Sequence, residues 1–177
     1  MRELVFVIDS LGGLLVGAFL LRLLLQWARA DFRNPVARAV LQVTNPLVLP
    51  LRRLLPPLGA LDTAAAVAVI LVQALRHALV IGLSGFPVDD PTLLLAGTLL
   101  SLADTLLLLY MGLLLVYVVL SWVSPSGPHP LSHLLWQVLA PLLRPFRALP
   151  SPAGIDLAPF FLFLALQVAR MLLARLG

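Results

Sequence analysis

The sequence predicts an all-α membrane protein of four transmembrane helices, built from two tandem helix–loop–helix repeats with Pro/Arg-rich amphipathic loops. Three observations lead to this prediction. Hydrophobic residues make up 61% of the 177 residues and charged residues only 11%, whereas soluble domains are about 45–50% apolar and about 25% charged. Apolar stretches near or above about 18 residues recur along the chain. The second half of the chain nearly repeats the first.

Composition excludes several classes of function. The chain has no Cys, which rules out disulfides, thiolate metal sites, iron–sulfur clusters and Cys nucleophiles. All 12 basic residues are Arg, and the formal net charge is +4. In a soluble protein this charge would suggest a nucleic-acid partner. Here most of the Arg flank apolar segments, so orientation in the membrane and contact with anionic lipid explain them better. The length fits a single membrane domain, residues 1–177.

Four apolar segments are candidates to cross the membrane, at about residues 4–28, 63–83, 93–123 and 155–173. Their Leu-rich runs lack alternation, which predicts helices rather than barrel strands. The third segment is longer than the roughly 20 residues that a bilayer needs. We therefore expect it to tilt or to begin outside the hydrocarbon core.

The charges between these segments predict an orientation. The loops at about 28–61 and 124–154 lie on the same side of a four-span protein and together hold seven Arg. The opposite side holds two Arg and, near residue 90, two Asp. The positive-inside rule then places the long loops in the cytoplasm. We expect a multi-pass protein of the bacterial inner membrane with both termini in the periplasm.

The repeat has one order of residues in both copies, at about 4–83 and 93–173. The offset is 95 residues up to Arg52 and Arg147 and 94 beyond them. Two crossings per copy return the chain to its starting side, so the copies are parallel and related by a pseudo-twofold along the membrane normal. The repeat motif comprises, in the first copy, Asn45, Pro46, Pro50, Arg52, Arg53, Pro56, Gly59, Asp62 and Gln73, and in the second, Pro141, Pro145, Arg147, Pro150, Gly154, Asp156 and Gln167.

The two motif segments read NPLVLPLRRLLPPLGALD, residues 45–62, and APLLRPFRALPSPAGID, residues 140–156. With the apolar helix that follows each, they resemble the YggT family, which is related to YlmG proteins. The second copy departs from the usual form, because Arg53 has no separate counterpart and Ser151 replaces Pro57. The resemblance implies a small bacterial inner-membrane protein. It also implies links to osmotic-stress tolerance, potassium uptake, division or cell-shape organisation and, in plastids, assembly of a b-type cytochrome complex.

The prolines of the first loop predict a broken helix. Pro46, Pro50 and Pro56 remove backbone donors and disfavour helical geometry in the residues before them. We therefore expect a short helix over about 36–44, followed by turns. Val36, Val40 and Val43 would share one face of it, which suggests packing at the membrane interface, although a solvated connector fits as well.

The Arg and Asp of the motif allow three interpretations. Arg52 and Arg147 could bind lipid phosphate or acidic partner residues, form ion pairs with Asp62 and Asp156, or serve only as orientation charge. The two Asp residues precede apolar helices and are expected to cap them. The glycines at positions 59 and 154 would supply the turns that enter these caps.

Polar residues inside the apolar segments are the other candidates. Gln73 and Gln167 lie about three turns into their helices, where an amide either bonds across helices at the pseudo-twofold or lines a central pathway. Charged or titratable side chains in a membrane span are functional candidates by default. Here they are Arg22, Arg76, His77 and Asp104. We expect Arg76 and Asp104 to lie close enough to form a pair.

These features favour a non-catalytic protein without a cofactor. The sequence has no catalytic motif at recognisable spacing, and His77 has no second intramembrane His for haem ligation. Gly13 and Gly17 would suit close helix contacts, including a homo-oligomer. The first hypothesis is an inner-membrane scaffold or assembly factor that engages anionic headgroups and unidentified membrane proteins. The alternative is a potassium or osmolyte channel or transporter whose path is lined by the intramembrane polar residues.

Overall fold

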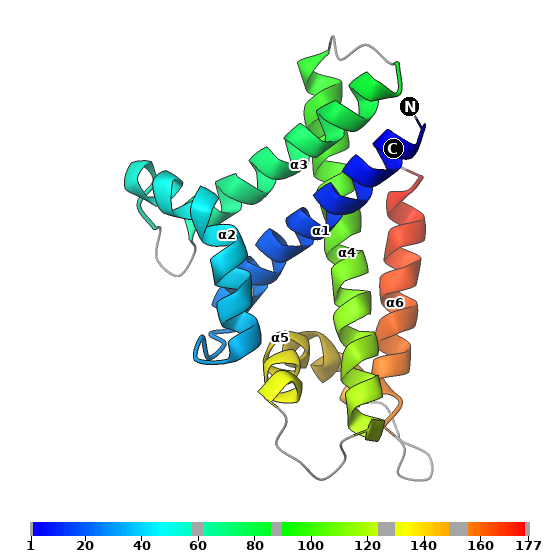
Figure 1. The fold of residues 1–177 in the computed structure, drawn as a ribbon. Coiled ribbons are helices and arrows are strands. Elements are labelled where there is room, and N and C mark those ends of the chain that lie inside the picture. Colours follow the sequence, from blue (N-terminus) through cyan, green and yellow to red (C-terminus); the bar gives the residue numbers. More distant parts are fainter. Residues whose placement is uncertain (1, 58–61, 86–89, 124–129, 149–155, 176–177) are drawn as a thin grey trace.

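The computed structural model describes residues 2–57, 62–85, 90–123, 130–148 and 156–175. This described part forms six α-helices, α1 (Arg2–Trp27), α2 (Pro35–Leu54), α3 (Thr63–Leu83), α4 (Pro91–Val123), α5 (Pro130–Arg147) and α6 (Ala158–Leu173). Both chain ends lie at one end of the molecule, and α2 and α5 lie toward the other ends of the long helices (Figure 1). The all-α membrane fold predicted from the sequence is confirmed.

Among the described helices, α1, α3 and α4 are long and apolar enough to cross a membrane. The fourth predicted span is shorter than expected, because α6 has 16 residues and begins at Ala158. Helix α4 has 33 residues, which corresponds to about 50 Å at 1.5 Å per residue. It is therefore longer than the hydrocarbon core of about 30 Å.

The prediction that the prolines of the first loop break its helix is wrong. Helix α2 runs without interruption through Pro46 and Pro50, and α5 runs through Pro141 and Pro145. Each pair is four residues apart, so both prolines lie on one side of the helix, and all four are exposed. The carbonyls that they leave without an N–H donor therefore lie where water or headgroups can bond to them. Pro56 is consistent with its predicted effect, since α2 ends just before it.

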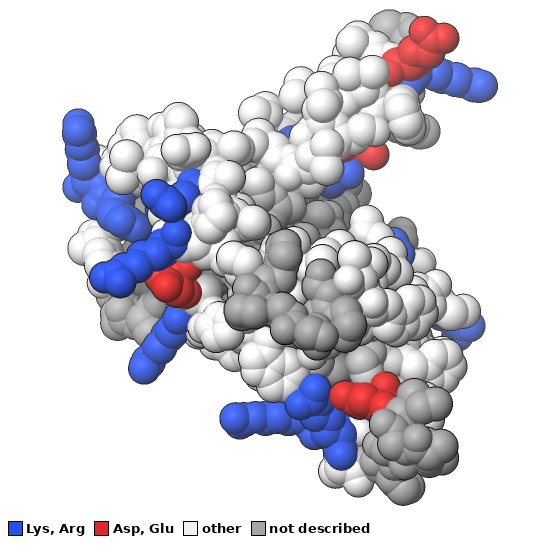
Figure 2. All heavy atoms as spheres, turned by 60° about the horizontal axis from the view of Figure 1, so that its bottom comes forward, with Lys and Arg blue, Asp and Glu red and all other residues white. Residues whose placement is uncertain are grey.

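Helices α2 and α5 are amphipathic. The buried residues of α2 are Ala37, Val40, Thr44 and Val48, at helical spacing. Of the three Val residues that we expected to share an interfacial face, Val40 is buried, Val36 is half-buried and Val43 is exposed. Both helices carry two Arg in the last turn, where positive charge complements the helix dipole. Figure 2 brings this end of the molecule forward and shows basic side chains standing out in separate groups around a largely uncharged surface.

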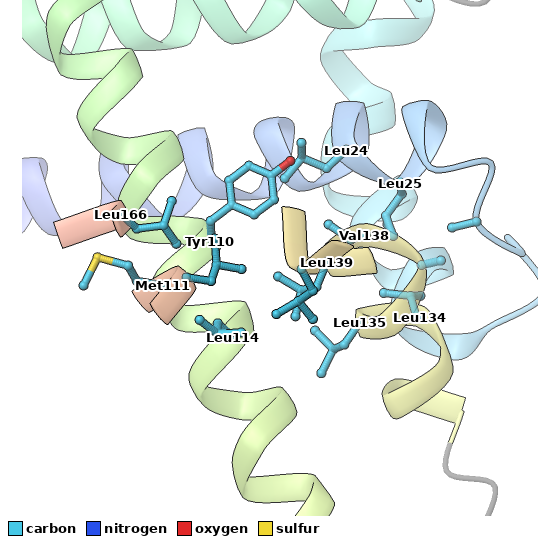
Figure 3. Packing of buried hydrophobic residues seen from close by; sticks show 14 of the residues in the cluster. Leu24, Leu25, Tyr110, Met111, Leu114, Leu134, Leu135, Val138, Leu139 and Leu166 are labelled. Atoms are coloured by element: carbon cyan, nitrogen blue, oxygen red, sulfur yellow. The ribbon is translucent and has the colours of Figure 1, made fainter. Parts of the chain in front are cut away.

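Two apolar clusters hold the helices together. The first joins α1, α2 and α3 and includes the fully buried Ala64, Ala65 and Ala68, which give α3 a contact face of small side chains. The second joins α1 to α4, α5 and α6, with Leu25, Tyr110, Leu114, Leu139 and Leu166 among its members (Figure 3). Because α1 contributes to both clusters, the two repeats share one packed interior.

Candidate functional site

Two groups of hydrogen-bonded polar side chains link the helices of the bundle. We name the first the loop-side cluster; it consists of Arg22, Gln26, Thr44, Asn45, Arg52 and Asp62. We name the second the ion-pair cluster; it consists of Asp9, Arg76, Asp104 and Arg170. The loop-side cluster joins α1 to α2 and α3, whereas the ion-pair cluster joins α1 to α3 and α4 to α6.

Arg22 is the centre of the loop-side cluster. Although charged, this residue is only 1% exposed. Its guanidinium donates to the hydroxyl of Thr44 at 2.7 Å and to the amide oxygen of Asn45 at 2.9 Å. A carboxylate oxygen of Asp62 lies 3.9 Å away. A buried charge needs such partners, because leaving it unpaired costs several kcal/mol, about 3–5 in comparable cases. Arg22 therefore fastens α1 to α2.

Asp62 connects the three helices of the first repeat. Its carboxylate accepts the backbone N–H of Ala65 at 3.2 Å, which confirms the predicted helix cap. It also accepts from the amide of Gln26 at 3.0 Å and from the guanidinium of Arg52. Burial alone would raise the pKa of Asp62, but the hydrogen bonds from Gln26, Arg52 and Ala65 outweigh it and lower that pKa. The carboxylate is thus held in its charged form.

The second repeat has the same ion pair in a more open setting. Arg147 contacts Asp156 at 3.3 Å, with the two side chains 41% and 49% exposed. Asp156 accepts the N–H of Ala158 at 3.0 Å, although the helix cap itself is Leu157. The guanidinium of Arg147 lies 4.3 Å from the ring centre of Trp136. Of the three interpretations for the motif Arg, the ion pair is therefore the one present in both repeats. Gly59, Pro150 and Gly154 lie outside the described residues.

The ion-pair cluster corrects one expectation. Arg76 does not pair with Asp104; it contacts Asp9 on α1 at 2.8 Å. Asp104 instead receives two hydrogen bonds from Arg170 on α6, at 2.7 and 3.0 Å. Arg76 lies directly against Gly12 and Gly13, where an added Cβ would come within about 3.0 and 3.4 Å of its side chain. These glycines let the guanidinium lie along α1, which brings it to Asp9.

Asp9 and Arg170 are the functional candidates that sequence reasoning missed. The signal was present in the repeat itself, because the offset of 95 relates Asp9 to Asp104 and the offset of 94 relates Arg76 to Arg170. Applying the offset to every intramembrane charge would have given two equivalent pairs rather than one mixed pair. Each repeat therefore joins its two spanning helices by an Asp–Arg ion pair at an equivalent position.

The two pairs border a common polar cavity of about 180 Å³. Gln73 also lines it and accepts a hydrogen bond of 3.3 Å from Arg76 on its own helix. Gln167 is exposed. The expectation of two equivalent amides packed across the pseudo-twofold is therefore wrong. His77 lies at the cavity against Gly97, where an added Cβ would come within 2.5 Å of Nε2. Among the described residues, no group of three His, Cys, Asp or Glu side chains could hold a metal.

The fold and these clusters define a class, an all-helical membrane protein of two tandem, pseudo-symmetric repeats. The chain belongs to the CCB3/YggT family, whose model matches residues 1–83 and 96–177, as two copies would. It is 38% identical over 170 residues to an uncharacterized protein of Pseudomonas aeruginosa, covering 95% of this chain and 86% of that protein. It is 37% identical over 172 residues to the uncharacterized protein YggT of Escherichia coli K12, covering 97% and 89%. No solved structure matches the chain.

Proposed function

We propose that this protein is a non-catalytic scaffold or assembly factor of the bacterial inner membrane. In this proposal it presents α2 and α5 at the cytoplasmic interface. The observation that carries it is the loop-side cluster, in which Arg22 and Asp62 fix α2 against α1 and α3. A connecting segment that only linked two spans would not need a buried guanidinium to position it.

The outer face of the positioned helix has the properties of a contact surface. Arg38 and Arg53 are exposed on α2, and so are the apolar side chains of Val43, Leu47 and Leu54. Helix α5 exposes Arg144 in the same way, and the basic groups are visible in Figure 2. Arg next to apolar side chains suits anionic headgroups and acidic segments of membrane partners. Partner binding of this kind could take part in osmotic-stress or envelope and division functions.

Two exposed aromatic residues support the placement of α2 and α5 at a membrane interface. Trp27 ends α1, and Trp122 lies at the equivalent position near the end of α4. Trp is enriched where the hydrocarbon core meets the headgroups. Both therefore mark the interface on the side of α2 and α5. Because the chain has no native Cys, single Cys residues at Arg33 and Ser84 should react with an impermeant thiol reagent only from opposite sides. Labelling of both positions from one side would contradict the orientation.

Ion transport is the second candidate, and one observation favours it. Asp9, Gln73, Arg76 and Asp104 converge on the polar cavity, as residues of a conduction path would. Two features favour the scaffold instead. The acidic side chains are already paired with Arg. Beyond the cavity, in the direction of α2 and α5, α1 and α4 bury apolar side chains such as Phe19 and Leu114.

The deciding experiment compares potassium flux with partner contact. Proteoliposomes that hold the folded chain should show no potassium flux above that of empty vesicles. Flux that disappears in the Asp104→Asn, Gln73→Leu variant would favour the transport candidate. In cells, a photoreactive residue at position 53 or 144 should crosslink to a discrete protein or to anionic lipid. The control is the exposed position 99 on α4, which should not give the same protein adduct. Loss of the crosslink from position 53 on Arg38→Glu, a change at another exposed Arg of α2, would tie it to charge.

A further inference from the structure

Helices α1 and α4 border an apolar groove of about 830 Å³ that the helices of the chain do not fill. Its lining follows the pseudo-twofold, because the two repeats supply equivalent residues to it. Examples are Asp9 and Asp104, Gly17 and Gly112, and Val40 and Leu135. Its volume falls in the range of about 300–1,000 Å³ that is typical of small-molecule sites. The groove is a feature of the paired repeats, and neither repeat forms it alone.

The groove is open because of its glycines. A Cβ added at Gly17 or Gly112 would meet no atom within 4 Å. Neither glycine is therefore needed for close packing within the chain. Space of this kind between apolar helices in a membrane is occupied by apolar chains, since an empty groove would lose dispersion contacts along its whole length.

One end of the groove is charged. Asp9, Arg76 and Asp104 line it there, and Arg170 is bonded to Asp104. The two carboxylates are only partly covered by their Arg partners, since their side chains remain 49% and 42% exposed. They can therefore accept further hydrogen bonds. The cluster holds two negative and two positive groups, so its net charge is zero.

The charged end lies toward the membrane surface opposite the two exposed Trp residues. Asp9 is 18 residues from Trp27, and Asp104 is 18 residues from Trp122. This spacing corresponds to about 27 Å along each helix. With the two Trp residues at one interface, this length places the carboxylates in the opposite half of a hydrocarbon core about 30 Å thick, where a headgroup can reach them. The apolar part of the groove then runs beside the acyl chains.

We propose that this groove binds a phospholipid of the phosphatidylethanolamine type. The primary ammonium would donate to Asp9 and Asp104, the phosphate would accept from Arg76 and Arg170, and an acyl chain would lie along Gly17 and Gly112. A zwitterionic headgroup matches a cluster of zero net charge that has both signs within reach. A second copy of the chain fits less well, because an apolar helix in the groove would cover the carboxylates without donating to them.

The test measures lipid retention by the purified full-length chain. Native mass spectrometry would compare phosphatidylethanolamine, phosphatidylcholine and phosphatidylglycerol with the same acyl chains. Choline has no N–H, so we expect phosphatidylethanolamine to be retained about tenfold better than phosphatidylcholine, the factor that one charge-assisted hydrogen bond supplies. Asp9→Asn with Asp104→Asn should remove this preference. Gly17→Leu with Gly112→Leu should fill the groove and reduce retention of phosphatidylethanolamine.

The matched control is Gly82→Leu. Gly82 is also open to an added Cβ, but it lies on α3 and not in the groove, so retention should stay at the wild-type level. Equal retention of the two zwitterionic lipids by the wild type would overturn the proposal. Preference for phosphatidylglycerol would do so as well, in favour of an anion site. A lipid-free dimer that crosslinks through position 17 or 112 would replace the lipid by a second copy. If the groove-filling variant does not fold, the wild-type comparison of headgroups still decides the matter.

Discussion

The two repeats join their helices by different chemistry at equivalent positions. In the first, the loop-side cluster buries the charge of Arg22 between α1, α2 and α3. In the second, the offset of 95 puts Tyr117, Ser121, Leu139 and Ala140 in place of Arg22, Gln26, Thr44 and Asn45. Leu139 is fully buried in the apolar cluster. Tyr117 stacks on Trp136 with ring centres 6.3 Å apart. An apolar and aromatic contact thus replaces a polar network.

We call the place where α2 or α5 packs against the spanning helices of its repeat the joint. The difference shows that the fold does not require buried charge there. The second repeat holds α5 in place without it, and removing two charges from water is costly. Stability alone therefore does not account for the network in the first repeat. A network of fixed donors and acceptors does restrict α2 to one position, because any shift would leave Arg22 or Asp62 unpaired. We infer that precise placement of α2 is its role, in keeping with the proposed contact surface.

The largest effect should come from breaking the buried network. Asp62→Asn leaves Arg22 without a counter-charge, and we expect a loss of about 3 kcal/mol, as for other buried pairs that lose one partner. The equivalent Asp156→Asn should cost under about 1 kcal/mol, because its pair is half exposed. Reversible unfolding in mixed micelles would measure both. Equal losses in the two variants would contradict the contrast between the joints.

The loss of stability at acid pH should report on the carboxylate of Asp62 without a mutation. The pKa of Asp62 is lower in the folded chain than its usual value. Its contribution to stability is therefore complete above a pH of about 4, near the ordinary carboxyl pKa. It is lost as the pH falls further, through the lower pKa of the folded state. Unfolding measured from pH 6 to pH 2 should show a steeper loss in the wild type than in Asp62→Asn. Parallel pH profiles would argue against a charged Asp62 in the cluster.

Replacing Gly12 by the residue at the equivalent position of the second repeat should disturb the ion-pair cluster. Gly12 corresponds to Leu107, and a Cβ at Gly12 would already come within 3.0 Å of the Arg76 side chain. Gly12→Leu should therefore displace Arg76 from Asp9 and destabilise the protein by about 2 kcal/mol, the usual scale of overpacking. Gly82→Leu is the control, since its site is open. A harmless Gly12→Leu would show that Arg76 has another position available.

The ion pairs themselves should behave alike in the two repeats. Asp9→Asn and Asp104→Asn each leave a partly exposed Arg without its carboxylate. We expect each variant to lose about 1 kcal/mol of unfolding free energy, a value between those for a surface pair and for a buried pair. Because the pairs share a cavity, the double variant should deviate from the sum of the two. A cost confined to one repeat would show that the pairs are not functionally equivalent. Unfolding of both single variants and of the double variant would test this.

The sequence predicted the class and the repeat well because both depend on long patterns. Apolar length predicted α1, α3 and α4, and the offset of the motif related Arg52 to Arg147 and Asp62 to Asp156. Proline was a weaker guide. Pro46 and Pro50 interrupt α2 in sequence but not in space, since the exposed side of the helix tolerates their missing donors.

Pairing between helices was the part that local patterns could not give. Asp104 and Arg76 are on neighbouring helices. Which carboxylate each Arg contacts depends on the helix surface along which its side chain lies. Gly12 and Gly13 decide this for Arg76. The burial of Arg22 was equally hidden, because its partners Thr44 and Asn45 lie on a helix that the prolines argued against. Because the sequence did not predict that α2 continues through its prolines, it did not predict the hydrogen bonds of Arg22 in the loop-side cluster either.

The smallest change in stability is expected from the variant with the most substitutions. Arg22→Tyr, Thr44→Leu and Asn45→Ala together install the residues of the second repeat at the joint of the first. The buried guanidinium and its two acceptors leave together, while Asp62 keeps Gln26, Arg52 and the N–H of Ala65 as donors. Replacing a whole buried network by apolar groups of similar volume is often neutral or stabilising, so we expect a change within about 1 kcal/mol. If placement of α2 is what the network provides, this stable variant should nevertheless lose the crosslink from position 53. A variant that is stable and keeps the crosslink would separate the network from the scaffold function, because α2 would then be placed equally well by apolar contacts alone.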